Sequence, residues 1–233
     1  MWNGKLKAIT FSYDDGVTQD LRLAKMFHKY DLKATFNLNY ELLGKHRILL
    51  RDGVHITHYK LDPRDVPFVY EGHEIAAHTL THPSLPKIED DAEIIRQVEE
   101  DRLKLSELAG YEVVGFAYPG GGVNHDERVA KLIRENTGIR YARTTVPAES
   151  FDPQENLYQF RPHAHHHADM DALFALAEKF LALKTDKPQF LYIWGHAYEF
   201  DIRDDWGRFE EFCQMVSHHD DVFYGTNKEV LLG

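Results

Sequence analysis

Apolar and polar residues alternate in blocks along the chain, and these blocks predict strands that are each followed by a helix. Seven apolar runs of four to six residues have the length and composition of buried strands. Strands of this kind are buried between helices in a parallel β/α architecture, either a barrel or a doubly wound sheet. The predicted strands are residues 6–11, 33–38, 74–77, 113–118, 139–144, 189–194 and 221–224.

Helical periodicity fills most of the segments between these strands. The clearest helix covers residues 90–110 and ends at Gly110, and further helices are expected over residues 205–217 and in the C-terminal tail. Residues 45–70 are less regular, with a helix start at Asp62-Pro63. Three residues are expected to cap helices with their side chains. Thr18 precedes an apolar face that begins with Leu21, and Asn124 forms a capping box with Glu127. The third cap is expected at Asp169.

Most polar residues that could take part in catalysis or metal binding stand directly after predicted strands. In a β/α barrel the loops after the carboxyl ends of the strands form the active face. The sequence therefore predicts one site at that end of the fold. The residues concerned are Asp14-Asp15-Gly16, His78 with His82, Pro119-Gly120-Gly121 and Gly195-His196.

Composition and charge exclude several classes of protein. Hydrophobic residues make up 43% of the 233 residues, which excludes global disorder, and no linker interrupts the pattern, so a single domain over residues 1–233 is expected. The 27 basic and 38 acidic residues give a charge of −11 without a basic cluster, so no nucleic-acid partner is expected. Cys213 is the only cysteine and cannot form an intramolecular disulfide. The first residues lack a signal core and no apolar run could span a bilayer, so we expect a cytoplasmic protein without a membrane partner.

Two histidines and two aspartates are candidates for a metal site. His78 and His82 are four residues apart, which on a helical turn places both imidazoles on one side. With 15 histidines in the chain, about one such pair arises by chance, so the spacing alone is weak. Asp14 and Asp15 can both serve one site only if the strand breaks there, which Gly16 permits. An isolated Asp-Asp-Gly favours a solvated turn or a helix cap, whereas its combination with the histidine pair favours a metal site.

Four segments together resemble the motifs of the polysaccharide deacetylase family, the NodB-type carbohydrate esterases. Residues 10–16, Thr-Phe-Ser-Tyr-Asp-Asp-Gly, resemble its first motif, Thr-Phe-Asp-Asp-Gly, with two extra residues. Residues 78–82, His-Thr-Leu-Thr-His, resemble the second motif. Residues 116–119 and 194–196 stand where the third and fifth motifs occur, in the family's order.

This resemblance implies a distorted (β/α) barrel with about seven parallel strands, and metal-dependent hydrolysis of an N-acetyl or O-acetyl group. It implies Asp15, His78 and His82 as metal ligands, Asp14 as general base and His196 as general acid. Backbone N–H groups near Tyr118, Pro119 and Gly120 are expected at the oxyanion. One divalent ion is expected, with Zn²⁺ as the first choice, because two imidazoles and a carboxylate also accept Co²⁺, Mn²⁺ or Fe²⁺.

The chain departs from the family pattern at two points. Ala117 stands where the third motif usually has an arginine that pairs with the base, and Arg143 or Arg161 could supply that charge from elsewhere. No counterpart of the fourth motif, which orients the late histidine, is found. The histidine-rich residues 163–167 are expected to form a loop beside the groove without a catalytic role. Candidate groove residues are His165, His166 and Trp194.

Other functions fit parts of the same pattern. The expected substrate is an acetylated sugar or oligosaccharide, and a small non-sugar amide is an alternative. A barrel that binds metal or carbohydrate without turnover is a further alternative, although it would need neither Asp14 nor His196. A phosphoesterase is disfavoured, because two-metal chemistry needs more clustered carboxylates. The sequence does not indicate an oligomeric state.

Overall fold

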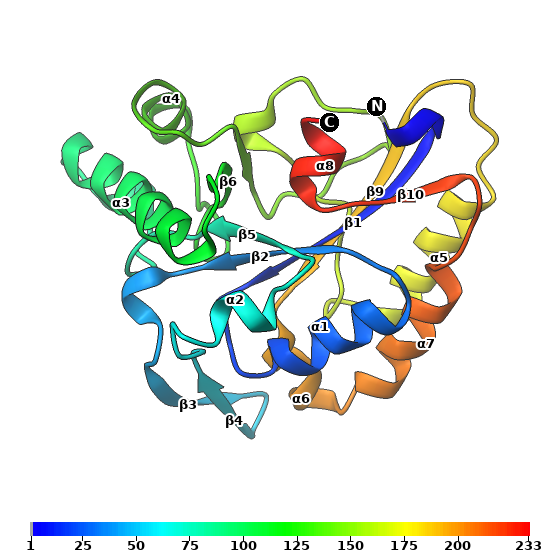
Figure 1. Cartoon of the computed structure of the whole chain (residues 1–233), viewed down its shortest axis with the longest axis horizontal. Coiled ribbons are helices and arrows are strands. Elements are labelled where there is room, and N and C mark those ends of the chain that lie inside the picture. The colour runs from blue at the N-terminus through cyan, green and yellow to red at the C-terminus, as the bar shows by residue number, and fades with distance from the viewer. Residues whose placement is uncertain (1) are drawn as a thin grey trace.

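The computed structural model describes residues 2–233 as a curled, mainly parallel sheet with helices packed around it (Figure 1). The strands are β1 (Lys7–Asp14), β2 (Ala34–Leu38), β3 (His46–Arg51), β4 (Val54–Tyr59), β5 (Glu74–Ala77), β6 (Gly115–Ala117), β7 (Tyr141–Arg143), β8 (Ala164–His165), β9 (Gln189–Gly195) and β10 (Val222–Tyr224). The helices are α1 (Asp20–Lys29), α2 (Val66–Val69), α3 (Asp91–Ala109), α4 (Glu127–Asn136), α5 (Met170–Leu181), α6 (Phe200–Arg203), α7 (Trp206–Val216) and α8 (Asn227–Leu231). Short 3-10 turns are η1 (Trp2–Gly4), η2 (Tyr40–Leu42), η3 (Leu85–Lys87), η4 (Leu157–Gln159) and η5 (Ala197–Glu199).

The main sheet has the order β7-β6-β5-β2-β1-β9-β8, and β10 pairs with β1 beside this path. Its strand pairs are all parallel. One segment connects the two edges of the curled sheet. Phe160 pairs with β7, where its N–H donates to the Ala142 carbonyl at 2.9 Å, and β8, which begins four residues later, pairs with β9. The expected distorted (β/α) barrel of about seven parallel strands is therefore confirmed.

The core explains why the strand ends hold their positions. All eight residues of β1 are buried, as expected for a central strand covered on both faces. Phe11 of β1 packs against Phe27 of α1, with ring centroids 4.8 Å apart, and against Phe209 of α7 at 6.5 Å. Burying each such side chain contributes about 1.5–3 kcal/mol. The carboxyl end of β1 is thus anchored by rigid packing on the helix side of the sheet.

Helix ends partly follow the expected signals. Asp90 caps α3, Gly110 ends it with a φ of 73°, and Asp169 caps α5. The cap predicted at Thr18 is wrong, because Gln19 is the N-cap residue of α1 and makes no side-chain cap, and Leu21 is 43% exposed. The capping box at Asn124 is also wrong: Asp126 caps α4, and the Asn124 amide donates to the carbonyls of Tyr118 and Gly120. No helix within residues 2–233 combines the length and hydrophobicity needed to cross a membrane.

The irregular residues 45–70 contain an antiparallel hairpin that the sequence pattern did not reveal. Strands β3 and β4 pair from His46 with Tyr59 to Arg51 with Val54, and the pair stands apart from the main sheet (Figure 1). Most of β3 is exposed, so its residues lack the apolar alternation that marks a half-buried strand. The hairpin leads from β2 into α2, and it lies beside the strand ends that carry the candidate chemistry.

Candidate functional site

The ends of several parallel strands surround one cavity of about 460 Å³. Asp14 is the last residue of β1, His165 is the last residue of β8, and His196 follows β9. The cavity is lined by, among others, Asp14, Asp15, His82, Gly120, Trp194 and His196. The structure therefore gathers these polar residues at the carboxyl ends of the strands, as the sequence predicts.

The chain turns sharply at Asp15, and this turn brings both aspartates to the cavity. Strand β1 ends at Asp14, and Asp15 has a φ of 85°, followed by Gly16 with a φ of 61°. Neighbouring side chains on a regular strand point to opposite faces, so the left-handed conformation is what lets the second carboxylate face the same side. The predicted strand break is present, and it begins at Asp15 itself.

Asp14 is held by a buried ion pair with Arg143. One guanidinium nitrogen lies 2.5 and 2.6 Å from the two carboxylate oxygens, and the Asn37 amide donates to the same carboxylate at 2.8 Å. Burial would raise the pKa of Asp14, but the Arg143 charge and hydrogen bond, together with His78 and His196, outweigh burial, and the pKa lies below the ordinary value. Asp14 is thus an ionised carboxylate at neutral pH. Arg143, from the end of β7, provides the charge that Ala117 cannot.

Asp15 is held by two residues of the hairpin region. The Lys60 ammonium lies 2.9 Å from one carboxylate oxygen, and His58 Nε2 lies 3.2 Å from the other. Burial would raise the pKa of Asp15, yet Lys60 and the His58 hydrogen bond hold it well below the ordinary value. His58 Nδ1 accepts from Arg47 at 3.1 Å, so its Nε2 carries the proton that Asp15 accepts.

His78 and His82 converge from a loop and not from the helical turn that their spacing suggested. Thr79 and His82 have φ values of 69° and 61°, which no regular helix contains. The ring centroids of the two histidines lie 4.9 Å apart. His78 donates from Nδ1 to the Ala117 carbonyl at 2.7 Å, and its backbone N–H donates to Asp101 at 2.9 Å. These contacts fix the ring and leave Nε2 facing the site.

The residues Asp15, His78 and His82 fit a divalent cation. One ligand atom from each lies within 4.8 Å of the others. His78 Nε2 is buried and has no hydrogen-bond partner within residues 2–233, which is costly for a polar atom unless another group occupies the site. Burial lowers the pKa of His78 to about 4 and also lowers that of His82, so both rings are neutral and able to coordinate. A carboxylate with two imidazoles is a common ligand set of catalytic zinc.

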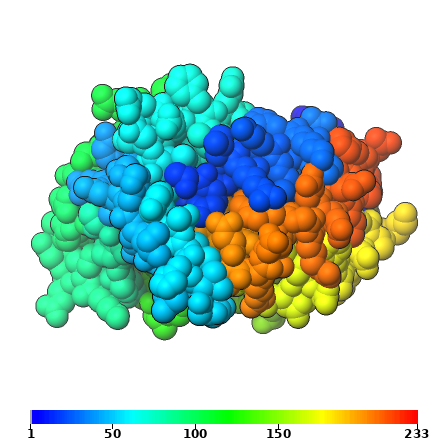
Figure 2. Space-filling model, turned by 90° about the horizontal axis from the view of Figure 1, so that it is seen from below, coloured from blue at the N-terminus to red at the C-terminus, as the bar shows by residue number. Residues whose placement is uncertain are grey.

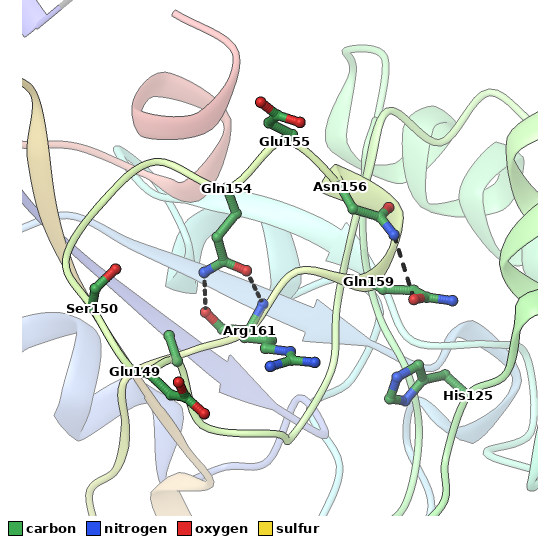
Figure 3. Close-up of a pocket in the computed structure, with 9 residues that line it drawn as sticks. His125, Glu149, Ser150, Gln154, Glu155, Asn156, Gln159 and Arg161 are labelled. Carbon is green, nitrogen blue, oxygen red and sulfur yellow. Dashed lines mark hydrogen bonds between the residues drawn. The ribbon is translucent and has the colours of Figure 1, made fainter.

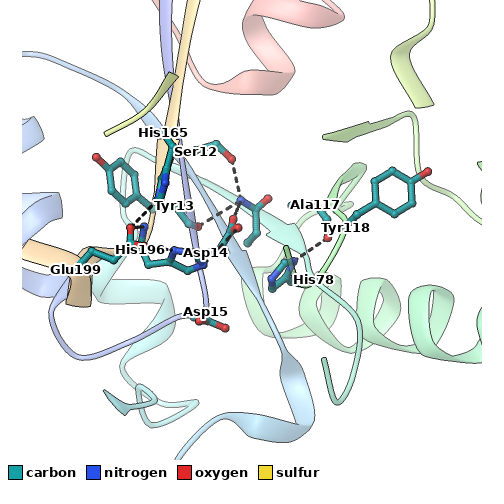
Figure 4. Close-up of polar contacts among 12 residues, drawn as sticks. Ser12, Tyr13, Asp14, Asp15, His78, Ala117, Tyr118, His165, His196 and Glu199 are labelled. Atoms are coloured by element: carbon teal, nitrogen blue, oxygen red, sulfur yellow. Dashed lines mark hydrogen bonds and ion pairs between the residues drawn. The ribbon is translucent and has the colours of Figure 1, made fainter. Parts of the chain in front are cut away.

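His196 lies across the cavity and is paired with Glu199. Its Nδ1 is 3.2 Å from a Glu199 oxygen, and its Nε2 is 4.0 Å from Asp14 (Figure 4). Burial lowers the pKa of His196, but the carboxylates of Glu199, Asp15 and Asp14 together outweigh burial and raise the pKa to about 9. His196 is therefore an imidazolium at neutral pH, and its Nε2–H points into the site.

Glu199 joins His196 to His165 in a second cluster. His165 Nε2 lies 2.8 Å from Glu199, and the His196 backbone N–H donates to the same oxygen at 2.9 Å. One ligand atom each of His165, His196 and Glu199 also falls within 4.8 Å of the others. Glu199 therefore links His165 to His196 in a polar network beside the first cluster.

Several of the predicted groove residues lie elsewhere. The Tyr118 side chain points away from the cavity and donates to the Tyr158 carbonyl (Figure 4), and its backbone N–H donates to Arg143, so Tyr118 offers no free donor. Pro119 has no N–H. The Gly120 N–H has no acceptor within residues 2–233 and lines the cavity. Arg161 lies in a separate pocket, where its backbone bonds Gln154 (Figure 3).

The histidine-rich segment divides between the cavity and the core. His165 and Trp194 stack at 4.3 Å and both line the cavity, and the Arg143 guanidinium covers the Trp194 ring at 4.6 Å. His166 is 1% exposed, stacks on Phe200 at 4.2 Å and is not a groove residue. His163 is buried as well, between the Ser150 carbonyl and the backbone N–H of β9.

Sequence reasoning missed the residues that orient the chemistry. Glu199 follows His196 by three residues, and a capping-box pattern was the only signal available. His58 and Lys60 belong to the unpredicted hairpin region, and Asp101 lies inside a long helix whose other acidic residues are solvated. Burial raises the pKa of Asp101 to about 8, even though two backbone N–H groups donate to it.

A family model described as polysaccharide deacetylase matches residues 3–142. A search of curated proteins found no match. Among solved structures, the family 4 carbohydrate esterase from Streptomyces lividans in complex with acetate is 14% identical, with a TM-score of 0.54, and the match covers 95% of this chain and 93% of that chain.

Two other structures are matched over less of their own length. A CE4 family pseudoenzyme from Bacillus anthracis is 15% identical with a TM-score of 0.55, and 99% of this chain covers 66% of that chain. The deacetylase PplD from Streptococcus pyogenes in complex with acetate is 19% identical with a TM-score of 0.47, over 59% of this chain and 55% of that chain. This chain thus spans two thirds or less of these two proteins. The matches to the Streptomyces lividans esterase and the Bacillus anthracis pseudoenzyme, both with TM-scores above 0.5, show a shared fold.

Proposed function

The chain belongs to the polysaccharide deacetylase family, and from this premise we propose that it is a metal-dependent hydrolase that removes acetyl groups from an acetylated sugar or oligosaccharide. The amide is the favoured bond, and an O-acetyl ester is the second candidate. The observation that carries the proposal is an ionised carboxylate, Asp14, facing a protonated imidazole, His196, at 4.0 Å beside the Asp15, His78 and His82 cluster.

Asp14 is suited to accept the proton of the attacking water. Its carboxylate lines the cavity, and the ion pair with Arg143 keeps it ionised. When the water oxygen adds to the acetyl carbon, one O–H bond breaks and its proton passes to Asp14. The Arg143 pair and the Asn37 amide fix the carboxylate in place, so the proton acceptor is positioned before substrate arrives.

His196 is suited to protonate the leaving group. Its Nε2–H faces the cavity, and Glu199 on the other side of the ring stabilises the charged form. When the bond between the acetyl carbon and the sugar nitrogen breaks, the proton on Nε2 passes to that nitrogen, which leaves as an amine. Products are acetate and the deacetylated sugar.

Asp15, His78 and His82 would hold the divalent ion, with Zn²⁺ first in order and Co²⁺, Mn²⁺ or Fe²⁺ also compatible. When bound, such an ion supplies Lewis-acid activation of water and of the acetyl carbonyl. The chain itself keeps both imidazoles neutral by burial and orients His78 through Ala117. Of the three predicted oxyanion residues, only Gly120 keeps a backbone N–H that is free of acceptors in residues 2–233, and we assign it as a donor to the carbonyl oxygen as negative charge develops there.

The proposal is tested by acetate release from acetylated chitooligosaccharides, acetylxylan and simple amides, with Zn²⁺ supplied. Wild-type protein should release acetate from at least one sugar substrate. Asp14→Asn should lower kcat by about 100-fold or more while zinc content stays the same. The exposed Asp186→Asn serves as a matched control and should keep full activity.

The pseudoenzyme among the structural relatives makes a non-catalytic barrel the natural alternative. Intact Asp14 and His196 favour catalysis, because metal binding alone requires neither. Absence of acetate release from every substrate with metal bound would reject the proposal. If only the simple amides react, the chain is a deacylase of small non-sugar amides.

A further inference from the structure

Two arginines of the hairpin line the cavity but have no role in the proposed deacetylation steps. Arg47, Leu49 and Arg51 alternate along β3, so their side chains share one face of the strand, and all three line the cavity. Ile48 and Leu50, on the opposite face, are 52% and 62% exposed. The hairpin thus presents an Arg-Leu-Arg face to the cavity, about 13 Å long from the strand rise.

The hairpin is docked against the wall of the cavity. The His58 ring of β4 packs edge-on against Tyr198 of η5 at 5.0 Å. Gln19 donates to the Thr57 carbonyl at 2.7 Å and to Asp201 of α6 at 2.8 Å, which links hairpin and wall. In the space-filling view, blue-to-cyan atoms adjoin the orange segment that follows β9 (Figure 2). The face is therefore held in place beside the catalytic groups.

Charge pairing leaves the two arginines uncompensated. Each carboxylate around the cavity already has a cation of its own: Asp14 pairs with Arg143, Asp15 with Lys60, and Glu199 with His196. Arg47 and Arg51 form no ion pair with any carboxylate in residues 2–233. Arg47 uses only its Nε, toward His58, so its terminal nitrogens remain available. In a chain with a net charge of −11, the mouth of this cavity is locally cationic.

We propose that the substrate is an acetylated sugar that carries an anionic group, a carboxylate or a phosphate, which Arg47 and Arg51 bind at the mouth of the cavity. Guanidinium groups bind both kinds of anion through paired hydrogen bonds. Leu49 between them offers an apolar contact for a sugar ring. This inference rests on the proposed function and specifies its substrate class.

The test compares kcat/KM for N-acetylglucosamine 6-phosphate, N-acetylmuramic acid and N-acetylglucosamine, with Zn²⁺ supplied. At least one charged sugar should exceed the neutral one by about tenfold or more, mainly through KM, and the preference should shrink at high ionic strength. The phosphate and carboxylate sugars distinguish the two kinds of anion. Arg47→Gln and Arg51→Gln should move the ratio of charged to neutral kcat/KM toward one, and Arg51→Lys should retain part of it. Arg161→Gln, in the separate pocket, should leave the ratio unchanged.

Equal kcat/KM for charged and neutral sugars would overturn the inference and leave the proposed function standing. A preference that survives in both glutamine variants would overturn it as well. If no sugar is hydrolysed, the proposed function fails, and calorimetric binding of N-acetylglucosamine 6-phosphate and N-acetylglucosamine then decides. Tighter binding of the phosphate that Arg51→Gln abolishes supports the anion site, and equal binding rejects it.

Discussion

Replacing Arg143 by methionine removes the buried counter-charge of Asp14. The two side chains are 1% and 3% exposed, so neither charge gains water when its partner is lost. Breaking one side of a buried ion pair costs about 3–5 kcal/mol, because the remaining charge is left uncompensated in a medium of low polarity. At ~2–4 °C per kcal/mol for a chain of this size, the melting temperature should fall by about 6–20 °C.

The pH dependence gives this prediction a definite sign. In the wild type the pKa of Asp14 lies below its ordinary value of 3.8, so the pair stabilises the fold above that value and the stabilisation is lost as pH falls through the lowered pKa. In Arg143→Met, burial loses its largest opposing contribution and the pKa of Asp14 rises. The stability difference between wild type and variant should therefore be largest near neutral pH and shrink toward pH 3–4.

Urea unfolding followed by tryptophan fluorescence at several pH values measures this difference. Arg161→Met is the matched control and should change the free energy of unfolding by less than about 0.5 kcal/mol, since it lies in the other pocket. The double variant Asp14→Asn with Arg143→Met should regain much of the lost stability but release no acetate. A loss below about 1 kcal/mol in Arg143→Met, or costs that simply add in the double variant, would refute the reasoning.

Three further outcomes follow from the site. Glu199→Gln should lower the pKa of His196 from about 9 toward 6.5, and the basic limb of the kcat/KM–pH profile should move to lower pH with it. If neither this limb nor the NMR titration of the imidazole changes, His196 is not the acid. The same pair stabilises the fold below pH 6.5 and loses this effect as pH rises through about 9. Lys60→Met should destabilise the zinc-free protein, because Asp15 loses its ammonium partner. The rise in melting temperature on adding Zn²⁺ should therefore be larger in the variant than in the wild type, and equal rises would contradict this prediction. Dialysis against a chelator should abolish acetate release, with recovery on adding Zn²⁺ or Co²⁺, whereas full activity after verified metal removal would exclude metal dependence.

The sequence predicted the parallel strands and the positions of most chemical groups because both depend on short-range patterns. Central strands such as β1 are buried on both faces and appear as apolar runs, and strand ends place Asp14 and His196 at one rim. The spacing of His78 and His82 suggested a helical turn, but the ligand loop contains left-handed residues that spacing does not encode. Their convergence, although not its geometry, was predictable.

Contacts between side chains that lie far apart in the sequence were harder to predict. Arg143 pairs with Asp14 across 129 positions, and the sequence narrowed the choice only to Arg143 or Arg161. The hairpin was missed because its exposed strand has no buried face to impose alternation. Glu199 was missed because the family's orienting residue was expected in a separate motif, whereas here the neighbouring turn η5 supplies a carboxylate.

The left-handed backbone at Thr79 sets stability and activity against each other. A β-branched residue with a φ of 69° costs about 1–2 kcal/mol relative to glycine, and the loop retains it while Thr79 Oγ1 accepts from the His82 N–H at 3.1 Å. A library of variants selected only for heat resistance should accumulate glycine at position 79. A library selected for turnover should keep the wild-type residue. Positions at which the two libraries differ would identify where this fold has lower stability in favour of activity.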